Sequence, residues 1–192
     1  MMKTRWMMLA VMVCLAGCGD SNTPGQEATP AANSAGTAAG TDANSAPRRA
    51  VAALQTAQGA AAGTATASAT GGGIRLALAV EGLPPGLHGA HVHMTGTCDA
   101  PRFESAGDHW NPANARHGLE APPGQHAGDM PNLTVGADGR GSLDHDLVGG
   151  SFEGLLEGDG TAMMIHAAAD DQRTDPSGNS GGRIACGVFR AG

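Results

Sequence analysis

Short runs of alternating or continuous apolar residues recur from residue 50 onward, and glycine-rich segments separate them. Each run has the length of a β-strand, and none keeps the 3.6-residue period of an amphipathic helix. The pattern predicts eight strands, at residues 51–55, 63–70, 74–82, 87–93, 132–137, 141–147, 161–166 and 184–190. The segment Gly136-Ala-Asp-Gly139 between two of these runs has the composition of a hairpin turn.

Eight short strands without helices predict an all-β protein, an antiparallel sandwich or barrel. The 31 glycines and few aromatic residues suit tight corners and a core of small side chains. Two long segments, 94–131 and 167–183, interrupt the strand pattern. Loops of this length in a compact domain are either functional or disordered. Because these two carry or flank most of the histidines, we predict that they are functional loops.

The N-terminus has the features of an export signal rather than of a folded domain. Lys3 and Arg5 precede an apolar run, residues 7–16, that is too short to span a bilayer. The run leads into Leu15-Ala16-Gly17-Cys18, which resembles the lipobox of bacterial lipoproteins, where the cysteine becomes the lipidated first residue. We therefore predict a lipoprotein signal peptide at 1–17 and lipidation at Cys18. An ordinary secretory signal is the alternative.

Residues 18–49 are rich in Ala, Gly, Ser, Thr, Asn and Pro, and they lack the apolar area needed to offset chain entropy. We predict a flexible tether that joins the lipid anchor to one domain, residues 50–192, which is long enough to bury a core. The protein would then be held by its lipid on the periplasmic side of a bacterial cell envelope. Gly19, rather than aspartate, after the cysteine favours the outer membrane.

The net charge and the cysteines of the chain further limit which functions are possible. Removal of the leader takes away two of the 11 basic residues and none of the 18 acidic ones, so the net charge becomes about −9. This excludes nucleic acid as a main partner, and an anionic substrate would need a local positive patch. Cys98 and Cys186 are the only cysteines of the predicted domain. In an exported chain we predict that they form a disulfide, with two separate buried thiols as the alternative.

Six of the eight histidines and one aspartate have spacings that fit two neighbouring metal sites. His91 and His93 share one face of a predicted strand, and His166 ends another. The second group lies in the first long loop and consists of His109, His117, His126 and Asp129. Three imidazoles and one carboxylate suit a closed tetrahedral zinc site, and imidazole also suits copper. The alternative is a polar loop with incidental histidines.

Several motifs around these residues resemble the copper,zinc superoxide dismutase family, above all its exported bacterial members. They are Gly86-Leu-His-Gly-Ala-His-Val-His93, Gly96-Thr-Cys98, Ser105-Ala-Gly-Asp-His-Trp-Asn-Pro112, Gly124-Gln-His-Ala-Gly-Asp129, His166-Ala-Ala-Ala-Asp-Asp171 and Gly178-Asn-Ser-Gly-Gly-Arg-Ile-Ala-Cys-Gly-Val188. The resemblance runs in order over residues 50–192. It implies an eight-stranded Greek-key β-sandwich or barrel, an architecture related to the immunoglobulin-like sandwiches.

The resemblance also implies the cofactors, copper and zinc, and a role for each matching residue. The copper ligands would be His91, His93, His109 and His166, and the zinc ligands His109, His117, His126 and Asp129. His109 would bridge the two ions and exchange a proton during catalysis. Asp170 would link a copper-ligand and a zinc-ligand imidazole, and Arg183 would dock the anionic substrate. The disulfide Cys98–Cys186 would tie the first long loop to the last strand.

The implied reaction is the disproportionation of superoxide to oxygen and hydrogen peroxide, by alternate reduction and oxidation of copper, in defence of the cell envelope. Two alternatives are a non-catalytic copper- and zinc-binding envelope lipoprotein and an adhesion or scaffold domain. The complete set of seven ligand positions favours the enzyme. The sequence leaves open whether the chain is a monomer or a homodimer.

Four polar residues near the motifs have simpler interpretations. His88 is predicted to be a structural histidine inside the barrel, and His145 a solvated side chain on an alternating strand. Asp171 is predicted to accept hydrogen bonds within its loop. Arg173 either attracts anions or pairs with Asp175.

Overall fold

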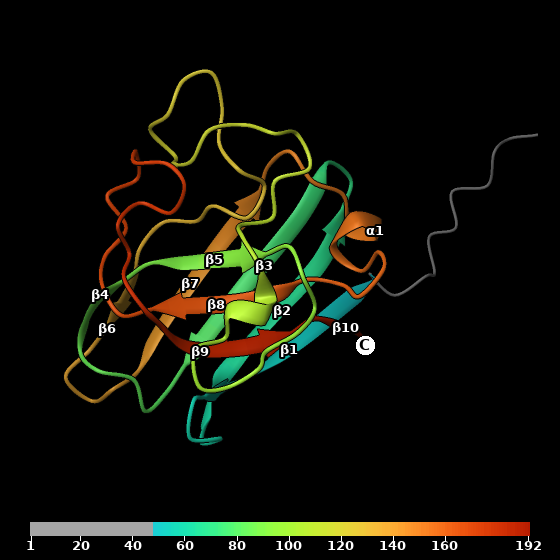
Figure 1. Ribbon diagram of the computed structural model, residues 1–192. Helices are drawn as coiled ribbons and strands as arrows, with labels where there is room; N and C mark the ends of the chain where they lie inside the picture. The colour runs from blue at the N-terminus through green and yellow to red at the C-terminus, as the bar shows by residue number, and fades with distance from the viewer. Residues whose placement is uncertain (1–47) are drawn as a thin grey trace, which may run out of the picture. The chain divides into compact units, whose positions relative to one another are not determined.

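The computed structural model describes residues 48–192. The predicted leader, Cys18 and nearly all of the predicted tether therefore lie outside the described residues. None of the helices in the described part is long and apolar enough to cross a bilayer. The strands (Figure 1) are β1 (Arg49–Thr56), β2 (Ala61–Thr70), β3 (Gly73–Val80), β4 (Gly86–His88), β5 (Ala90–His93), β6 (Leu133–Val135), β7 (Gly141–Leu147), β8 (Ala162–His166), β9 (Arg183–Val188) and β10 (Arg190–Ala191).

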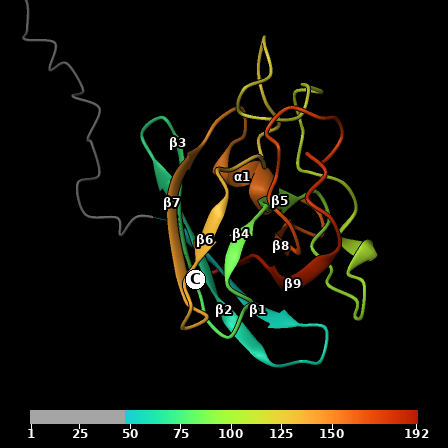
Figure 2. The ribbon, with the colours of Figure 1, turned by 90° about the vertical axis from the view of Figure 1, so that its left-hand side faces the viewer.

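The strands form one antiparallel sheet that closes on itself. The order is β4-β6-β7-β3-β2-β1-β9-β8-β5, and β10 pairs with β1. β4 and β5 stand at the two ends of this order, yet only Gly89 separates them in the chain. They are the two halves of the predicted strand 87–93, and this strand pairs with β6 through one half and with β8 through the other. Figure 2 shows β3 and β7 on one side of the barrel, with β8 and β9 on the other.

The ten strands therefore correspond to the eight predicted ones, because β9 and β10 are likewise halves of one strand, divided at Phe189. The connections from β3 to β4 and from β7 to β8 join strands that are not neighbours in the sheet, which is the Greek-key pattern. The predicted fold class is confirmed. The predicted hairpin turn joins β6 to β7, and the Gly136 N–H donates to the Arg140 carbonyl at 2.8 Å.

The alternation of buried and exposed residues along the strands shows which side chains form the core. On β3, Ile74, Leu76 and Leu78 are buried while the residues between them are exposed. Full burial of such a side chain is worth about 1.5–3 kcal/mol. β8 differs, because all five of its residues are buried. Met163 and Ile165 face the barrel core, whereas Met164 packs with Phe103 and Cys186 under the first long loop. Because the barrel core covers one face of β8 and the first long loop covers the other, its last residue, His166, lies between the barrel and the loops.

Two expectations were wrong in detail. The domain is not free of helix, because a short 3-10 turn (Glu104–Ala106) and one α-helical turn, α1 (Phe152–Leu155), interrupt the loops. Turns this short cannot show a helical period in the sequence. The second correction concerns His145, which is half-buried opposite Leu76 on the core-facing side of β7.

Candidate metal centre

The β5–β8 pair brings three histidines together. His91 and His93 are two residues apart on β5 and project to the same side, and β5 pairs with β8, which ends at His166. The Nε2 atoms of His93 and His166 are 3.4 Å apart. A change of register between Ile165 and His166 turns the end of β8 toward the loop side. All three side chains are buried.

His109 completes this group from the first long loop, where it forms an isolated bridge with His93. Each of the four histidines offers one nitrogen, and these atoms all lie within 4.8 Å of one another. Within the described residues, Nδ1 of His91 and Nε2 of His109 are buried and have no hydrogen-bond partner. An unsatisfied buried polar atom costs about 1–3 kcal/mol. Two such atoms among four convergent nitrogens fit a metal ion, which would use their lone pairs.

The remaining nitrogens of this group are held by acceptors. His93 donates from Nδ1 to the Gly107 carbonyl at 2.8 Å, and His166 donates from Nδ1 to the Gly181 carbonyl at 3.2 Å. A proton fixed on Nδ1 leaves Nε2 free as a ligand atom. Both acceptors come from the two long loops, so the loops orient the rings that the strands supply.

The second group lies on the other side of His109. Oδ1 of Asp129 is 3.0 Å from Nδ1 of His109, 3.0 Å from Nδ1 of His117 and 3.3 Å from Nδ1 of His126. The other carboxylate oxygen, Oδ2, accepts from the main-chain N–H groups of Gly118 and His126 at 2.7 and 3.1 Å. Three nitrogens and one oxygen around a common point are a donor set that suits zinc.

The two groups share one imidazole. His109 presents Nδ1 to the Asp129 group and Nε2 to the His91 group, so its ring lies between them. The ring stacks on that of His91, with their centroids 4.0 Å apart. A single side chain therefore fixes the separation of the two sites.

Asp170 connects the groups by a second route. Its Oδ2 is 2.6 Å from Nε2 of His91, and its Oδ1 is 3.1 Å from Nε2 of His117. Asn132 holds the main chain of Asp170 from both sides: its Oδ1 accepts from the Asp170 N–H at 2.7 Å, and its Nδ2 donates to the Asp170 carbonyl at 2.8 Å. Sequence reasoning missed Asn132, which carries no signal beyond its place before a strand.

Burial and hydrogen bonding set the protonation of these residues. Burial lowers the pKa of His91 to about 4 and that of His166 to about 3. Their rings are therefore neutral at neutral pH, with a free lone pair for a metal. For Asp129, burial opposes ionisation, but hydrogen bonds from His109 and His117 keep its pKa well below the usual range.

His117 behaves differently from the other two histidines. Burial would lower its pKa, but its hydrogen bonds to Asp129 and Asp170 outweigh burial and raise the pKa to about 9. In the metal-free protein His117 thus holds a proton that a metal ion has to displace.

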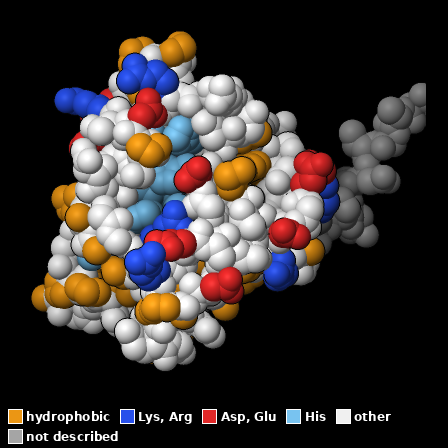
Figure 3. Space-filling model, viewed as in Figure 1, with side chains coloured by type: hydrophobic (Ala, Val, Ile, Leu, Met, Phe, Trp, Pro, Cys, Tyr) orange, Lys and Arg blue, Asp and Glu red, His pale blue; other side chains and the backbone are white. Residues whose placement is uncertain are grey.

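Arg183 lies beside the first group, paired with His166 in the β8–β9 register. It is half-buried, and its guanidinium donates to the carbonyls of Phe103 at 2.6 Å and Gly107 at 2.7 Å. A surface pocket adjoins it, lined by Pro101, Arg102, Glu104, Gly181, Gly182 and Arg183. Figure 3 shows histidine side chains on one face of the molecule with basic and acidic side chains next to them. The guanidinium of Arg183 supplies a local positive charge, which an anionic substrate would require.

The structure confirms three other predictions, for the two cysteines, for His88 and for Asp171. Cys98 and Cys186 form a disulfide with an S–S distance of 2.01 Å, as predicted. His88 contacts the main-chain oxygens of His166 and Pro84, at 2.7 and 2.8 Å, and is structural as predicted. Asp171 accepts from the N–H groups of Arg173 and Thr174 in its loop, as predicted.

Arg173 pairs with Glu120, at 2.7 Å from its Nε, and not with Asp175, whose partner is Arg116. Of the two alternatives for Arg173, pairing with Asp175 was therefore wrong. Arg173 forms an ion pair between the two long loops.

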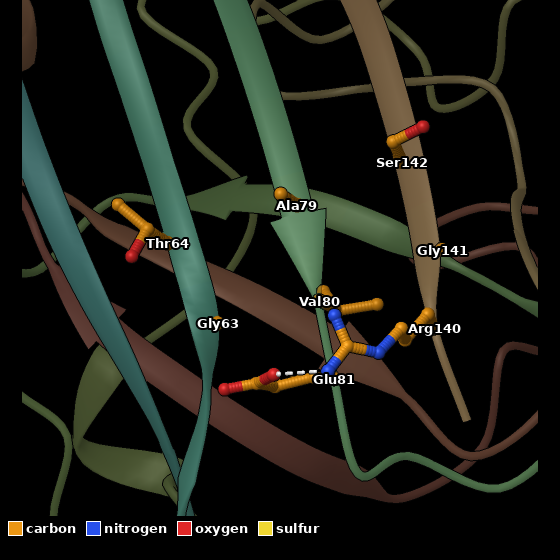
Figure 4. A pocket seen from close by; sticks show the side chains of 8 residues that line it. All are labelled: Gly63, Thr64, Ala79, Val80, Glu81, Arg140, Gly141 and Ser142. Carbon is orange, nitrogen blue, oxygen red and sulfur yellow. Dashed lines mark ion pairs between the residues drawn. The ribbon is translucent and has the colours of Figure 1, made fainter. Parts of the chain in front are cut away.

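A separate pocket lies on the outer face of β2, β3 and β7 (Figure 4). Small residues line it, and its charged residues, Glu81 and Arg140, form an ion pair at 3.3 Å. It contains none of the histidines, so we assign it no part in metal binding.

The fold and the site define a β-barrel protein with two adjoining groups of side chains that could each hold a metal ion and that share a histidine. The model of the copper/zinc superoxide dismutase family (SODC) matches residues 57–189. A Cu-Zn superoxide dismutase of Aquifex aeolicus is 40% identical over 150 residues, 74% of this chain and 86% of that protein. A superoxide dismutase-like protein of Bacillus subtilis is 46% identical over 123 residues, and the match spans 61% of this chain and 63% of the relative.

Solved structures agree with these relatives. The Cu/Zn superoxide dismutase of Brucella abortus superposes with a TM-score of 0.61 at 28% identity, over 74% of this chain and 99% of that one. A SOD-like protein of Bacillus subtilis gives 0.65 at 41% identity, over 72% and 96%. The chain belongs to the copper/zinc superoxide dismutase family, and its cofactors are copper and zinc.

Proposed function

We propose that this chain disproportionates superoxide at the two sites described above. Copper would be held by His91, His93, His109 and His166, and zinc by His109, His117, His126 and Asp129. The observation that supports this assignment is the shared ring of His109, with Nδ1 in the Asp129 group and an unpartnered, buried Nε2 in the His91 group. The all-nitrogen set suits copper, and the set with a carboxylate suits zinc.

Copper, when bound, supplies the one-electron chemistry by which one superoxide becomes oxygen and a second, with two protons, becomes hydrogen peroxide. The protein residues supply binding and proton transfer. The guanidinium of Arg183, fixed by two carbonyls, binds the anion beside His166. Nε2 of His109 is the atom that can hold a proton for the departing peroxide. The Asp129 group keeps the opposite nitrogen of that ring in place.

Asp170 would tune both ligand groups. A carboxylate on the outer nitrogen of a ligand histidine fixes the ring and raises its basicity. Asp170 contacts one histidine of each group, so the same carboxylate would orient a ring in both sites.

We also propose that the enzyme acts in the bacterial cell envelope, anchored to the membrane by lipid on Cys18, with the outer membrane favoured by Gly19. The supports are the lipobox-like Leu15–Cys18 segment and the polar, small-residue stretch that follows it. A homodimer is one of the two oligomeric states that the sequence leaves open.

The test compares metal-free protein with protein loaded with copper and zinc. We expect one copper and one zinc per chain and dismutation by the loaded form alone. Removal of zinc should also change the electron paramagnetic resonance spectrum of copper, because the two ions share His109. A chain that binds both metals and leaves superoxide untouched would support the alternative, a non-catalytic metal-binding lipoprotein.

A further inference from the structure

Asp175, in the second long loop, contacts the main chain of a residue in the zinc group. Its Oδ1 accepts a hydrogen bond from the N–H of His117 at 2.5 Å, and its Oδ2 accepts from Nε of Arg116 at 3.1 Å. The carboxylate side chain is 44% exposed, whereas the His117 side chain is fully buried. A surface carboxylate therefore holds the backbone of a buried ligand.

The peptide groups on both sides of His117 are fixed by carboxylates. The N–H of His117 donates to Asp175, and the next N–H, that of Gly118, donates to Asp129 at 2.7 Å. This stretch of the first loop has no regular secondary structure that could position it. Two successive hydrogen bonds to carboxylates hold the direction of the chain at the residue whose ring enters the zinc group. Bonds of this charge-assisted kind are about twice as strong as neutral ones.

A second ion pair between the same loops provides a comparison. Arg173 pairs with Glu120, and both side chains are about as exposed as those of Arg116 and Asp175. The Glu120 carboxylate contacts Arg173 and none of the ligand residues in the described structure. Exposed ion pairs are worth about 0–1 kcal/mol by themselves. The two pairs thus differ mainly in whether the carboxylate also holds a ligand backbone.

We propose that Asp175 is a positioning residue for zinc: by accepting the His117 N–H it aligns that histidine with the rest of the group and slows loss of the ion. The inference rests on the proposed assignment of zinc to His117. Linkage makes the effect reciprocal, so zinc binding should stabilise the second loop around Asp175. The same loop carries Asp170 and lines the pocket beside Arg183 at Gly181 and Gly182.

The test measures zinc affinity of the metal-free full chain by competition with a chromophoric chelator. Asp175→Ala should raise the zinc dissociation constant by about 10–100-fold, the usual effect of losing a group that orients a ligand. Asp175→Asn keeps a carbonyl oxygen for the His117 N–H and should fall between wild type and Asp175→Ala. Glu120→Ala, the matched control, should bind zinc like wild type.

Two further readouts separate positioning from general loop stability. Co²⁺ in the zinc site should show altered d–d bands in Asp175→Ala and unaltered ones in Glu120→Ala. Zinc should protect the amides of residues 171–178 from hydrogen exchange in wild type and protect them less in Asp175→Ala. Thermal melting of the metal-free variants establishes that they fold, and Asp175→Asn supplies the test if Asp175→Ala does not.

Equal zinc affinity in wild type and the folded Asp175 variants would overturn the inference, and so would an equal loss in Glu120→Ala. A wild-type chain that binds no zinc would instead overturn the proposed function.

Discussion

Both proposed metal sites depend on His109, whose ring lies between the two groups. Its two nitrogens point to opposite groups, and its stacking on His91 at 4.0 Å and its contact with Asp129 fix its orientation. Because an imidazole is rigid, this one side chain would set the distance between ions held by the two groups.

Substitution of Arg183 should separate substrate binding from metal binding. Arg183→Ala removes the cation beside His166, and we expect kcat/KM to fall by about 10–100-fold at low salt while copper and zinc stay bound. Arg173→Ala is the control, because that arginine is engaged by Glu120. Pulse radiolysis at several ionic strengths measures both. Unchanged activity in Arg183→Ala would remove this residue from the mechanism.

The buried histidines predict an acid-sensitive metal-free protein. In the folded chain the pKa of His91 is about 4 and that of His166 about 3, both lowered chiefly by burial, against 6.5 when unfolded. Between pH 6.5 and about 4 the unfolded chain binds more protons, so the free energy of unfolding falls as pH falls. Each histidine contributes up to about 1.4 kcal/mol per pH unit.

Urea unfolding of the metal-free protein at pH 7 and pH 5 measures this loss. His166→Gln should show a shallower dependence, because one of the histidines with a lowered pKa is gone. Equal free energies of unfolding at the two pH values would contradict the assignment of these two histidines as buried and neutral.

At the scale of elements, the disulfide connects the first long loop to β9, next to the residues that hold Arg183. Cys98 and Cys186 are 88 residues apart, and Phe103 and Gly107, the acceptors for Arg183, lie inside the closed loop. The bond therefore restricts the unfolded chain and also the segment that positions the guanidinium.

Replacement of both cysteines by serine should lower the free energy of unfolding of the metal-free protein by about 4–5 kcal/mol, from the loop entropy of the unfolded chain. Urea denaturation of the double variant and of wild type measures the difference. Wild-type protein treated with a reductant should approach the variant. A midpoint that does not move in either sample would show that the bond contributes nothing to stability.

The strands and the spacing of the histidines could be predicted because both are local properties of the sequence. Alternating and continuous apolar runs predicted all eight strands, and the period of two placed His91 and His93 on one face. The division of 87–93 at Gly89 could not be predicted. A side chain there would come within 2.8 Å of the Ser180 Cβ, so the break depends on the packing of a loop residue 91 positions further along the chain. The contacts of Asn132 and Asp175 are equally non-local.

At the scale of the molecule, the later part of the first long loop and the second long loop lie at one end of the barrel, and strands β5 and β8 supply histidines beside them (Figure 1). The strands supply three histidines of the first group, and the loops supply His109, the rest of the second group and the acceptors that orient His93 and His166. Arg183 places a positive charge beside His166 in a chain whose net charge is negative. Metal binding should therefore stabilise the loops more than the barrel.

The proposed lipid anchor can be tested with the intact chain in its host. Cys18→Ser should remove the acylated residue, so that the protein leaves the membrane fraction and fails to incorporate labelled palmitate. Cys14→Ser is the matched control, because Cys14 would be removed with the leader and should leave anchoring intact. Two or more acyl chains bind a bilayer stably at about 0.8 kcal/mol per buried CH₂, so wild type should stay in the membrane at high salt. A wild-type protein that incorporated no palmitate and left the membrane fraction at high salt would refute the lipid anchor and leave an ordinary secretory signal as the interpretation of residues 1–17.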